Sequence, residues 1–267
     1  MSFADLHRPG EVPFLLPNAW DVPSALAFAD AGFPAVGTTS FGVAATAGHP
    51  DGGRASREAT AVLVRALAGV PVYVSADVED GYADDAEQVA EYVAGLGADG
   101  VNIEDSTGGR LIDPAAHAAK ITAVKRRSPD VFVNARVDTY WLGQDADLAP
   151  TLARAQRYVR AGADGVFVPG ATDPADLAAL AEAVPLPLNV LVVPGLTLSG
   201  LARLGVRRVS TGSLPYRAAV RAATLAATNV RDGGPLPDAA AYPVLQKRLT
   251  DYEAVAGRGR SGPTGVA

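Results

Sequence analysis

The sequence of 267 residues contains no cysteine, one methionine and only three histidines. The absence of cysteine excludes disulfide bonds, thiolate metal sites and thiol nucleophiles. No stretch approaches the roughly 18 consecutive apolar residues of a membrane-spanning helix. The N-terminus, MSFADLHRPGEVPF, lacks the charged segment followed by an apolar segment that marks a signal peptide. We therefore expect a cytoplasmic protein that has no membrane partner.

Basic charge is also scarce. Lys and Arg total 23 against 29 Asp and Glu, which gives a net charge of −6 and an isoelectric point near 5.1. This balance argues against a nucleic-acid partner. Hydrophobic residues make up 48% of the chain, which is typical of a globular protein with a large core, and the length suits a single α/β barrel.

A recurring pattern indicates the fold. In four segments a glycine follows a helical stretch and precedes an apolar strand, and each glycine is expected to end its helix in the left-handed conformation. These glycines are Gly32, Gly97, Gly162 and Gly205. Further strand candidates are FLLPN (14–18), VYVSAD (72–77), VFVNARVD (131–138) and LNVLVV (188–193). Short, continuous, valine-rich strands are typical of parallel strands buried on both faces.

Together these segments make eight strand–helix units, which predicts an α/β fold of the (β/α)8 TIM-barrel type. An open, doubly wound sheet is the alternative, and it is less favoured because no GxGxxG motif follows the first strand. We expect residues 1–255 to form this single domain. Residues 256–267 lack apolar periodicity and are expected to be a flexible tail.

Acidic residues follow two strands of the expected barrel. Asp77 and Glu79, two residues apart, would point the same way from a strand tip, and Glu104 follows the next strand. Three carboxylates without cysteine favour a hard divalent cation, Mg²⁺ or alternatively Mn²⁺. The alternative is an acidic patch that Arg136 and backbone amides neutralise.

Arg136 is the cation expected at this end of the barrel. It has two possible roles, as a bidentate clamp for a substrate carboxylate or as an internal partner of Asp138 or Glu104. The loop after the second strand, TTSFG (38–42), offers backbone amides for a carboxylate or phosphate. The same loop carries Asp51, a candidate acid or base.

Other polar residues carry weaker signals. STGS (210–213) is a weaker candidate for a phosphate site. His49, in the loop after the second strand, is a second acid–base candidate, although a surface role is favoured for it. His7 shows no functional pattern, and His117 is expected to be exposed on a helix.

Several motifs, taken together, resemble the isocitrate lyase / phosphoenolpyruvate mutase superfamily. The resemblance is carried by LPNAWDVPSALAFADAGFPAVGTTSFGVAATAGHPD, SADVEDGYADD, VNIEDS and NARVD. These motifs recur in order at successive strand ends, from about residue 14 to 230. The resemblance implies a (β/α)8 barrel, Mg²⁺, and small 2-oxo or 2-hydroxy carboxylate substrates that react through a metal-stabilised enolate.

The resemblance also assigns roles to individual residues. It implies a homotetramer, a dimer of dimers, whose subunits exchange the last helix, at about residues 215–228. The implied metal-binding residues, some acting through water, are Asp77, Glu79 and Glu104. The implied catalytic residues are Asp51 and Arg136. The candidate substrate contacts are Trp20, Thr39, Ser40, Phe41, Asp77, Arg136 and Asn189.

The chain departs from its relatives at three points. The lyases of this superfamily carry a Lys-Lys-Cys-Gly-His loop after the fourth strand, and this chain has the short segment IEDSTGGRLIDP instead. The mutases use a histidine after the sixth strand, and this chain has Pro169 in that neighbourhood. The mutases' longer gating loop is also missing. Asp51, Tyr82 and Tyr140 are the candidate proton donors in place of the missing cysteine.

We therefore expect a Mg²⁺-dependent lyase that acts on a small 2-oxo or 2-hydroxy di- or tricarboxylate, by C–C cleavage or formation or by decarboxylation. Phosphorus–carbon chemistry, as in a phosphoenolpyruvate mutase or phosphonopyruvate hydrolase, is one alternative. A non-catalytic 2-oxo acid binding protein is another, because the short loop after Glu104 would exclude water poorly. The sequence leaves the identity of the acid open.

Overall fold

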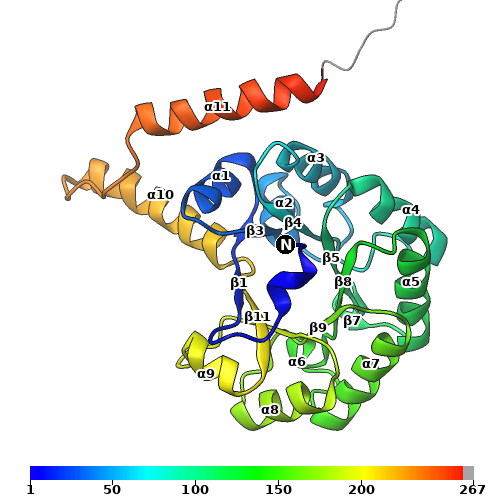
Figure 1. The fold of residues 1–267 in the computed structure, drawn as a ribbon. Coiled ribbons are helices and arrows are strands. Elements are labelled where there is room, and N and C mark those ends of the chain that lie inside the picture. The colour runs from blue at the N-terminus through cyan, green and yellow to red at the C-terminus, as the bar shows by residue number, and fades with distance from the viewer. Residues whose placement is uncertain (261–267) are drawn as a thin grey trace, which may run out of the picture.

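The computed structural model describes residues 1–260, and its main sheet is a ring of parallel strands (Figure 1). The strand order is β1-β11-β10-β9-β8-β5-β4-β3-β2. The bounds are β1 (Phe14–Leu16), β2 (Asn18–Ala19), β3 (Ala35–Thr38), β4 (Tyr73–Asp77), β5 (Gly100–Glu104), β8 (Phe132–Arg136), β9 (Gly165–Phe167), β10 (Leu188–Leu191) and β11 (Val206–Ser210).

Pro17 divides the expected first strand in two, and the two halves close the barrel. β1 pairs with β11 and β2 pairs with β3, so the segment occupies one of eight positions around the ring. Proline has no N–H to donate, but its carbonyl accepts from the Gly37 amide at 2.8 Å. Asn18 bonds to both neighbours, donating to the Thr38 carbonyl at 2.7 Å and accepting from the Gly212 amide at 2.8 Å. The (β/α)8 prediction is confirmed.

Helices surround the ring (Figure 1), and a two-stranded hairpin follows β5. The predicted left-handed glycines are confirmed, because Gly32, Gly97, Gly162 and Gly205 have φ angles of 86°, 66°, 101° and 90°. The remaining elements are η1 (Ala4–His7), α1 (Val22–Asp30), α2 (Ser40–Thr46), α3 (Arg57–Leu67), α4 (Ala86–Leu96), β6 (Ser106–Thr107), β7 (Arg110–Leu111), α5 (Pro114–Arg127), α6 (Thr139–Leu142), α7 (Leu148–Arg160), α8 (Pro174–Ala183), α9 (Leu198–Arg203), α10 (Leu214–Asp232) and α11 (Tyr242–Arg260).

The strands face two environments. Alternate residues, such as Val74 and Val101, belong to the apolar core that includes buried residues of the surrounding helices. Inside the barrel, Phe3, Leu16 and Phe132 form a separate apolar cluster. Beyond this cluster the interior is polar, and its buried side chains include Ser75, Asn102, Asn134, Asn189 and Arg208.

Two histidines are buried. His7 stacks on Phe132 with ring centroids 4.2 Å apart. His117 is fully buried against Tyr158, with centroids 4.6 Å apart, so the expectation that it is exposed was wrong. Its helix, α5, turns this face toward the barrel and α7. Burial lowers the pKa of His117 to about 3, because the apolar surroundings disfavour the charged ring.

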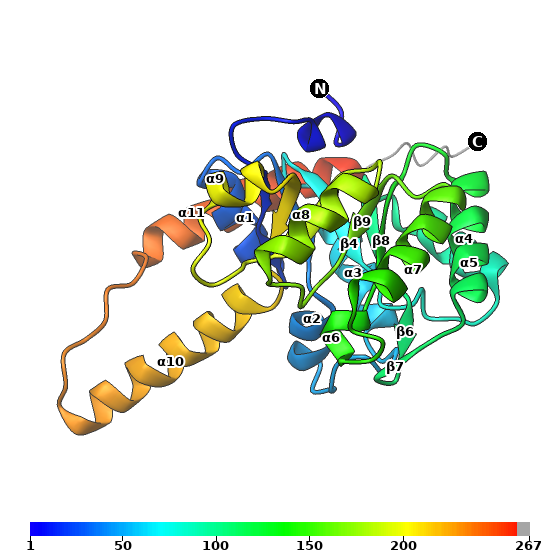
Figure 2. The ribbon, with the colours of Figure 1, turned by 90° about the horizontal axis from the view of Figure 1, so that it is seen from below.

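α10 extends away from the barrel, and α11 follows it in the chain (Figure 2). α10 contains residues 215–228 but is not the last helix, and within the described chain none of its residues is buried. α11 returns to the barrel, where the Tyr252 hydroxyl donates to the Ala66 carbonyl at 2.9 Å. Residues 256–260, expected in a tail, are helical, and residues 261–267 lie outside the described part. No helix within residues 1–260 is long and apolar enough to cross a membrane.

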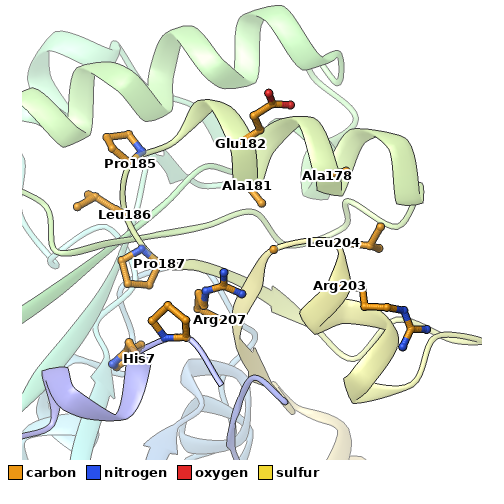
Figure 3. Close-up of a pocket in the computed structure, with 12 residues that line it drawn as sticks. His7, Ala178, Ala181, Glu182, Pro185, Leu186, Pro187, Arg203, Leu204 and Arg207 are labelled. Atoms are coloured by element: carbon orange, nitrogen blue, oxygen red, sulfur yellow. The ribbon is translucent and has the colours of Figure 1, made fainter. Parts of the chain in front are cut away.

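The two ends of the barrel differ. At the N-terminal end of the strands lies a cavity of about 510 Å³, whose lining includes His7, Pro187 and Arg207 (Figure 3). The acidic residues that the sequence singled out lie at the opposite end, after β4 and β5. In barrels of this type the C-terminal end of the strands carries the chemistry.

A substitution of Gly37 tests how closely the strands pack where the barrel closes. A Cβ there would lie 2.6 Å from Asn18 Nδ2 and 3.1 Å from a Leu16 methyl carbon. We expect Gly37→Ala to lower the stability by about 1–3 kcal/mol through overpacking, measured as a fall in Tm by circular dichroism. Gly95→Ala is the control, because that site in α4 has open space and alanine favours helix by about 1 kcal/mol. An unchanged Tm for Gly37→Ala would contradict the close packing of Gly37 against Leu16 and Asn18.

Candidate active site

Asp77 ends β4, and within residues 1–260 only one of its two carboxylate oxygens has a hydrogen-bond partner. Its backbone amide donates to Thr38 Oγ1 at 2.8 Å, and its Oδ2 accepts from the Ser40 amide at 3.0 Å. Its Oδ1 is buried and has no hydrogen-bond partner among the described residues. A buried carboxylate oxygen without a partner is costly, so this atom is a candidate ligand atom.

Two adjacent cavities open at this end of the barrel. The first has a volume of about 80 Å³ and is lined by Asp77 and Asn102, among others. The second, of about 150 Å³, is lined by Glu79 and Glu104, among others. Asp51, Arg136 and Trp141 line both cavities. The first cavity is far smaller than the roughly 300–1,000 Å³ of a drug-sized site, so it suits a compact ligand.

Glu79 does not point alongside Asp77, contrary to the expectation for two residues on one strand. The strand ends at Asp77, and Glu79 adopts a left-handed conformation with φ 48°. Its Oε1 accepts from Ser56 Oγ at 2.5 Å and its Oε2 from the Arg54 amide at 2.7 Å. Strained backbone of this kind is concentrated at functional sites.

Arg136 is an internal ion-pair partner of both residues named as alternatives. Its Nη1 donates to Glu104 Oε1 and its Nε to Asp138 Oδ1, both at 2.5 Å. Its guanidinium carbon lies 5.7 Å from the ring centres of Trp141 and of Phe167. Nη2 donates to no atom of residues 1–260, so the clamp role stays a prediction.

Burial and neighbouring acids both disfavour the charged forms of the carboxylates at this end. Burial raises the pKa of Asp77, and raises that of Glu104 well above its usual range, although Arg136 opposes both effects. Burial also raises the pKa of Glu79. Asp51 adds to the negative field at all three groups. A cluster of this kind favours the uptake of protons or of a cation.

The expected convergence of three carboxylates on a metal is not seen. Within residues 1–260, no three His, Cys, Asp or Glu side chains are close enough to hold an ion by themselves. The residues nevertheless fit Mg²⁺, because Mg²⁺ commonly uses one or two carboxylates and retains several waters. Asp77 Oδ1 would be the direct ligand, with Glu79, Glu104 and Asp51 acting through water. Metal binding by these residues stays a prediction.

The other expected substrate contacts lie in three places. Thr39 and Ser40 line the first cavity. Phe41 and Trp20 lie outside its lining and contact Tyr216, with ring centroids 5.9 and 5.5 Å away. Asn189 is buried inside the barrel, where its Oδ1 accepts from Ser210 Oγ at 3.1 Å. Of these residues only Thr39 and Ser40 therefore lie at the first cavity, and direct substrate contact stays a prediction.

The three candidate proton donors differ in position. The Tyr82 hydroxyl is buried against Ser56 and Thr60, at 2.9 and 3.1 Å. The Tyr140 hydroxyl donates to Asp176 Oδ2 at 2.8 Å. Neither tyrosine lines the two cavities, whereas Asp51 lines both.

The β6–β7 hairpin occupies the place of the missing lyase loop. Ser106 and the two glycines at its tip line the second cavity. The Gly108 amide donates to the Gly52 carbonyl at 3.2 Å, and Ser106 Oγ donates to Asp138 Oδ2 at 2.5 Å. The hairpin is thus joined to the loop that carries Asp51.

Sequence reasoning missed Arg208, which lies inside the barrel next to Asn102 and Ser210 of the first cavity. A signal for it exists, because Arg207 and Arg208 are consecutive in a strand. Successive strand residues point to opposite faces, so one of the two arginines has to enter a closed barrel.

A sequence model of phosphoenolpyruvate phosphomutase matches residues 3–231. The chain belongs to the phosphoenolpyruvate phosphomutase family. An uncharacterized protein of Mycobacterium tuberculosis (strain ATCC 25618 / H37Rv) is 60% identical over 95% of this chain and 98% of its own. The oxaloacetate decarboxylase of Rhodopseudomonas palustris (strain TIE-1) is 30% identical over 91% of this chain and 89% of its own.

Structural similarity agrees with this membership. A crystal structure of phosphonopyruvate hydrolase with oxalate and Mg²⁺ is 26% identical, covers 95% of this chain and 99% of its own, and has a TM-score of 0.78. Other similar proteins are 2-methylisocitrate lyases and a phosphorylmutase. The resemblance to the isocitrate lyase / phosphoenolpyruvate mutase superfamily is confirmed, and its named members are chiefly lyases and mutases.

Glu104 should make the stability of the metal-free protein depend on pH. Because its folded pKa lies above the ordinary value of 4.5, its contribution to stability is fully present below that value and is lost as the pH rises through the folded pKa. In Glu104→Gln this dependence disappears. We expect the Tm of wild type minus that of the variant to fall by a few degrees between pH 5 and 8, since ~1 kcal/mol corresponds to about 2–4 °C at this size. Calorimetry in EDTA measures it, and a constant difference would contradict the assignment.

Proposed function

We propose that this protein is a Mg²⁺-dependent lyase that makes or breaks a carbon–carbon bond in a small 2-oxo or 2-hydroxy di- or tricarboxylate, decarboxylation included. The observation that carries the proposal is the buried, unpartnered Oδ1 of Asp77 at a compact cavity that Arg136 also lines. An acid and a cation at one small cavity suit the joint binding of a metal ion and a carboxylate.

Each residue has a part in this proposal. Asp77 Oδ1 would hold Mg²⁺, which as a Lewis acid would stabilise the negative charge that develops on a 2-oxo acid when the adjacent bond breaks. The free Nη2 of Arg136 would bind a substrate carboxylate, and Trp141 and Phe167 restrict the movement of the guanidinium. Asp51, which lines both cavities, would exchange a proton with the substrate.

The wall of the first cavity formed by Phe167, Pro169 and Leu191 is apolar. No histidine lines either cavity in the described residues, which disfavours a mutase that relies on one. The 30% identity to an oxaloacetate decarboxylase along most of both chains supports decarboxylation as one form of the reaction. Phosphorus–carbon cleavage is the second candidate, supported by the likeness to phosphonopyruvate hydrolase.

Oxalate binding tests the proposed site, because oxalate resembles the planar enolate of pyruvate. By isothermal titration calorimetry, we expect oxalate to bind wild-type protein in the presence of Mg²⁺ and not in EDTA. Asp77→Asn, which keeps the shape but removes the charge, should weaken binding by about tenfold or more, since the loss of a metal-site contact commonly costs 10–100-fold. Asp113→Asn is the matched control, because asparagine caps a helix as well as aspartate does and Asp113 caps α5.

Oxalate binding that is independent of Mg²⁺, or unchanged in Asp77→Asn, would overturn the metal assignment. Release of pyruvate or CO2 from a panel of 2-oxo and 2-hydroxy acids would support a lyase or decarboxylase. A changed 31P spectrum of phosphonopyruvate would instead support phosphorus–carbon chemistry. Binding without any turnover would favour a non-catalytic 2-oxo acid binding protein.

We also propose that the protein is a homotetramer that uses α10 as a subunit contact. The helix exposes Val220, Leu225 and Val230, at 50, 51 and 66% of their surface, and exposed apolar side chains along one helix favour association. We expect light scattering coupled to gel filtration to give a tetramer for wild type and smaller species for Leu225→Asp. Val62→Asp, at a similarly exposed position on α3, is the control. A monomeric wild type would contradict the proposal.

A further inference from the structure

Arg208 is an arginine with no exposed surface, and it lies inside the barrel. Within residues 1–260 no carboxylate oxygen lies within ion-pair distance of it, and its Nη1 has no hydrogen-bond partner. Burial lowers its pKa to about 9, and the charge of Asp77 opposes this effect. Buried charges are normally paired, because the loss of hydration costs several kcal/mol per ion. An arginine kept in this position therefore calls for an explanation.

The side chain of Arg208 connects opposite sides of the barrel. It starts from β11, and its Nη2 donates to Asn102 Oδ1 on β5 at 3.1 Å. Three strand positions separate β11 from β5 in either direction around the ring (Figure 1), so this contact crosses the barrel interior. Asn134 Nδ2 donates to the same Asn102 oxygen at 2.9 Å. The guanidinium and Asn134 thus hold Asn102 in one orientation.

The residues that Arg208 holds belong to the floor of the first cavity. Asn102 and Ser210 both line that cavity, and Arg208 Nε lies 3.4 Å from Ser210 Oγ. Asn102 is also the register partner of Asp77 on the neighbouring strand. The guanidinium therefore lies beneath the cavity, on the interior side of the proposed metal ligand.

We propose that Arg208 is a positioning residue of this site, whose buried charge draws the substrate anion toward the floor of the cavity and whose hydrogen bonds fix Asn102 and Ser210 there. This inference rests on the proposed function, because it concerns the same anion. The charge has opposite effects on the two ligands, since it attracts a carboxylate and repels Mg²⁺. A purely structural role would weaken both ligands together.

The test compares three substitutions of Arg208 by calorimetry, with Mg²⁺ titrated alone and oxalate titrated at saturating Mg²⁺. In Arg208→Met we expect the Kd of oxalate to rise about tenfold while the Kd of Mg²⁺ stays equal or falls. Arg208→Gln should show the same changes in both Kd values. Because glutamine keeps a hydrogen-bond donor for Asn102, this variant replaces Arg208→Met if the methionine variant fails to fold. Arg208→Lys keeps the charge and should bind oxalate within about threefold of wild type.

Arg207→Gln is the matched control, because Arg207 is the adjacent residue and lines the cavity at the other end of the barrel (Figure 3). Its oxalate affinity should equal that of wild type. Neutral variants of Arg208 that bind oxalate like wild type, or that lose Mg²⁺ and oxalate equally, would overturn the positioning role. A lysine variant that binds oxalate as weakly as the neutral variants would also overturn it. A wild type that binds neither ligand would instead overturn the proposed function, and this inference with it.

Discussion

The alternation of side chains along the strands of a closed barrel is the constraint on which the rest of this structure depends. Each strand gives one row of residues to the helices and one to the interior. The outward row is apolar and forms the main core with the helices, as Val74 and Val101 do. The inward row is then free to be polar, and past the cluster around Phe132 it includes asparagines and an arginine. The barrel is stabilised mainly from outside, and its interior is available for function.

Charge balance follows from this arrangement. Asp77 and Glu104 end β4 and β5, and Arg136 ends the neighbouring strand, β8, where it offsets part of their charge. Among residues 1–260, its two ion pairs leave one nitrogen without a partner, and one oxygen of Asp77 stays unpartnered. Fully paired charges would make the site inert toward ions. The proposed joint binding of a metal ion and an anion depends on this incomplete pairing.

Much of the fold was predictable from the sequence, because valine-rich strands and helix-ending glycines are local signals. The strand-end positions of Asp77, Glu104 and Arg136 followed from the same pattern. The direction of individual side chains could not be predicted from this pattern. After the strand ends at Asp77, Glu79 itself adopts the left-handed conformation, which a glutamate at that position does not predict. Trp20 and Phe41 contact Tyr216, a neighbour 175 or more positions away along the chain. Arg208 shows that two consecutive arginines in a barrel strand are a usable signal.

The first strand has a consequence for how the chain folds. Its two halves pair with β3 and with β11, and the Asn18 amide donates to Thr211 Oγ1 across 193 residues of sequence. The barrel therefore cannot close until its last strand, β11, has been synthesised. Until then the partly made sheet has two open edges, and contacts of such long sequence separation form slowly. The last-made strand, β11, thus decides when the barrel closes, and the nascent chain has to avoid pairing its open edges with other chains in the meantime.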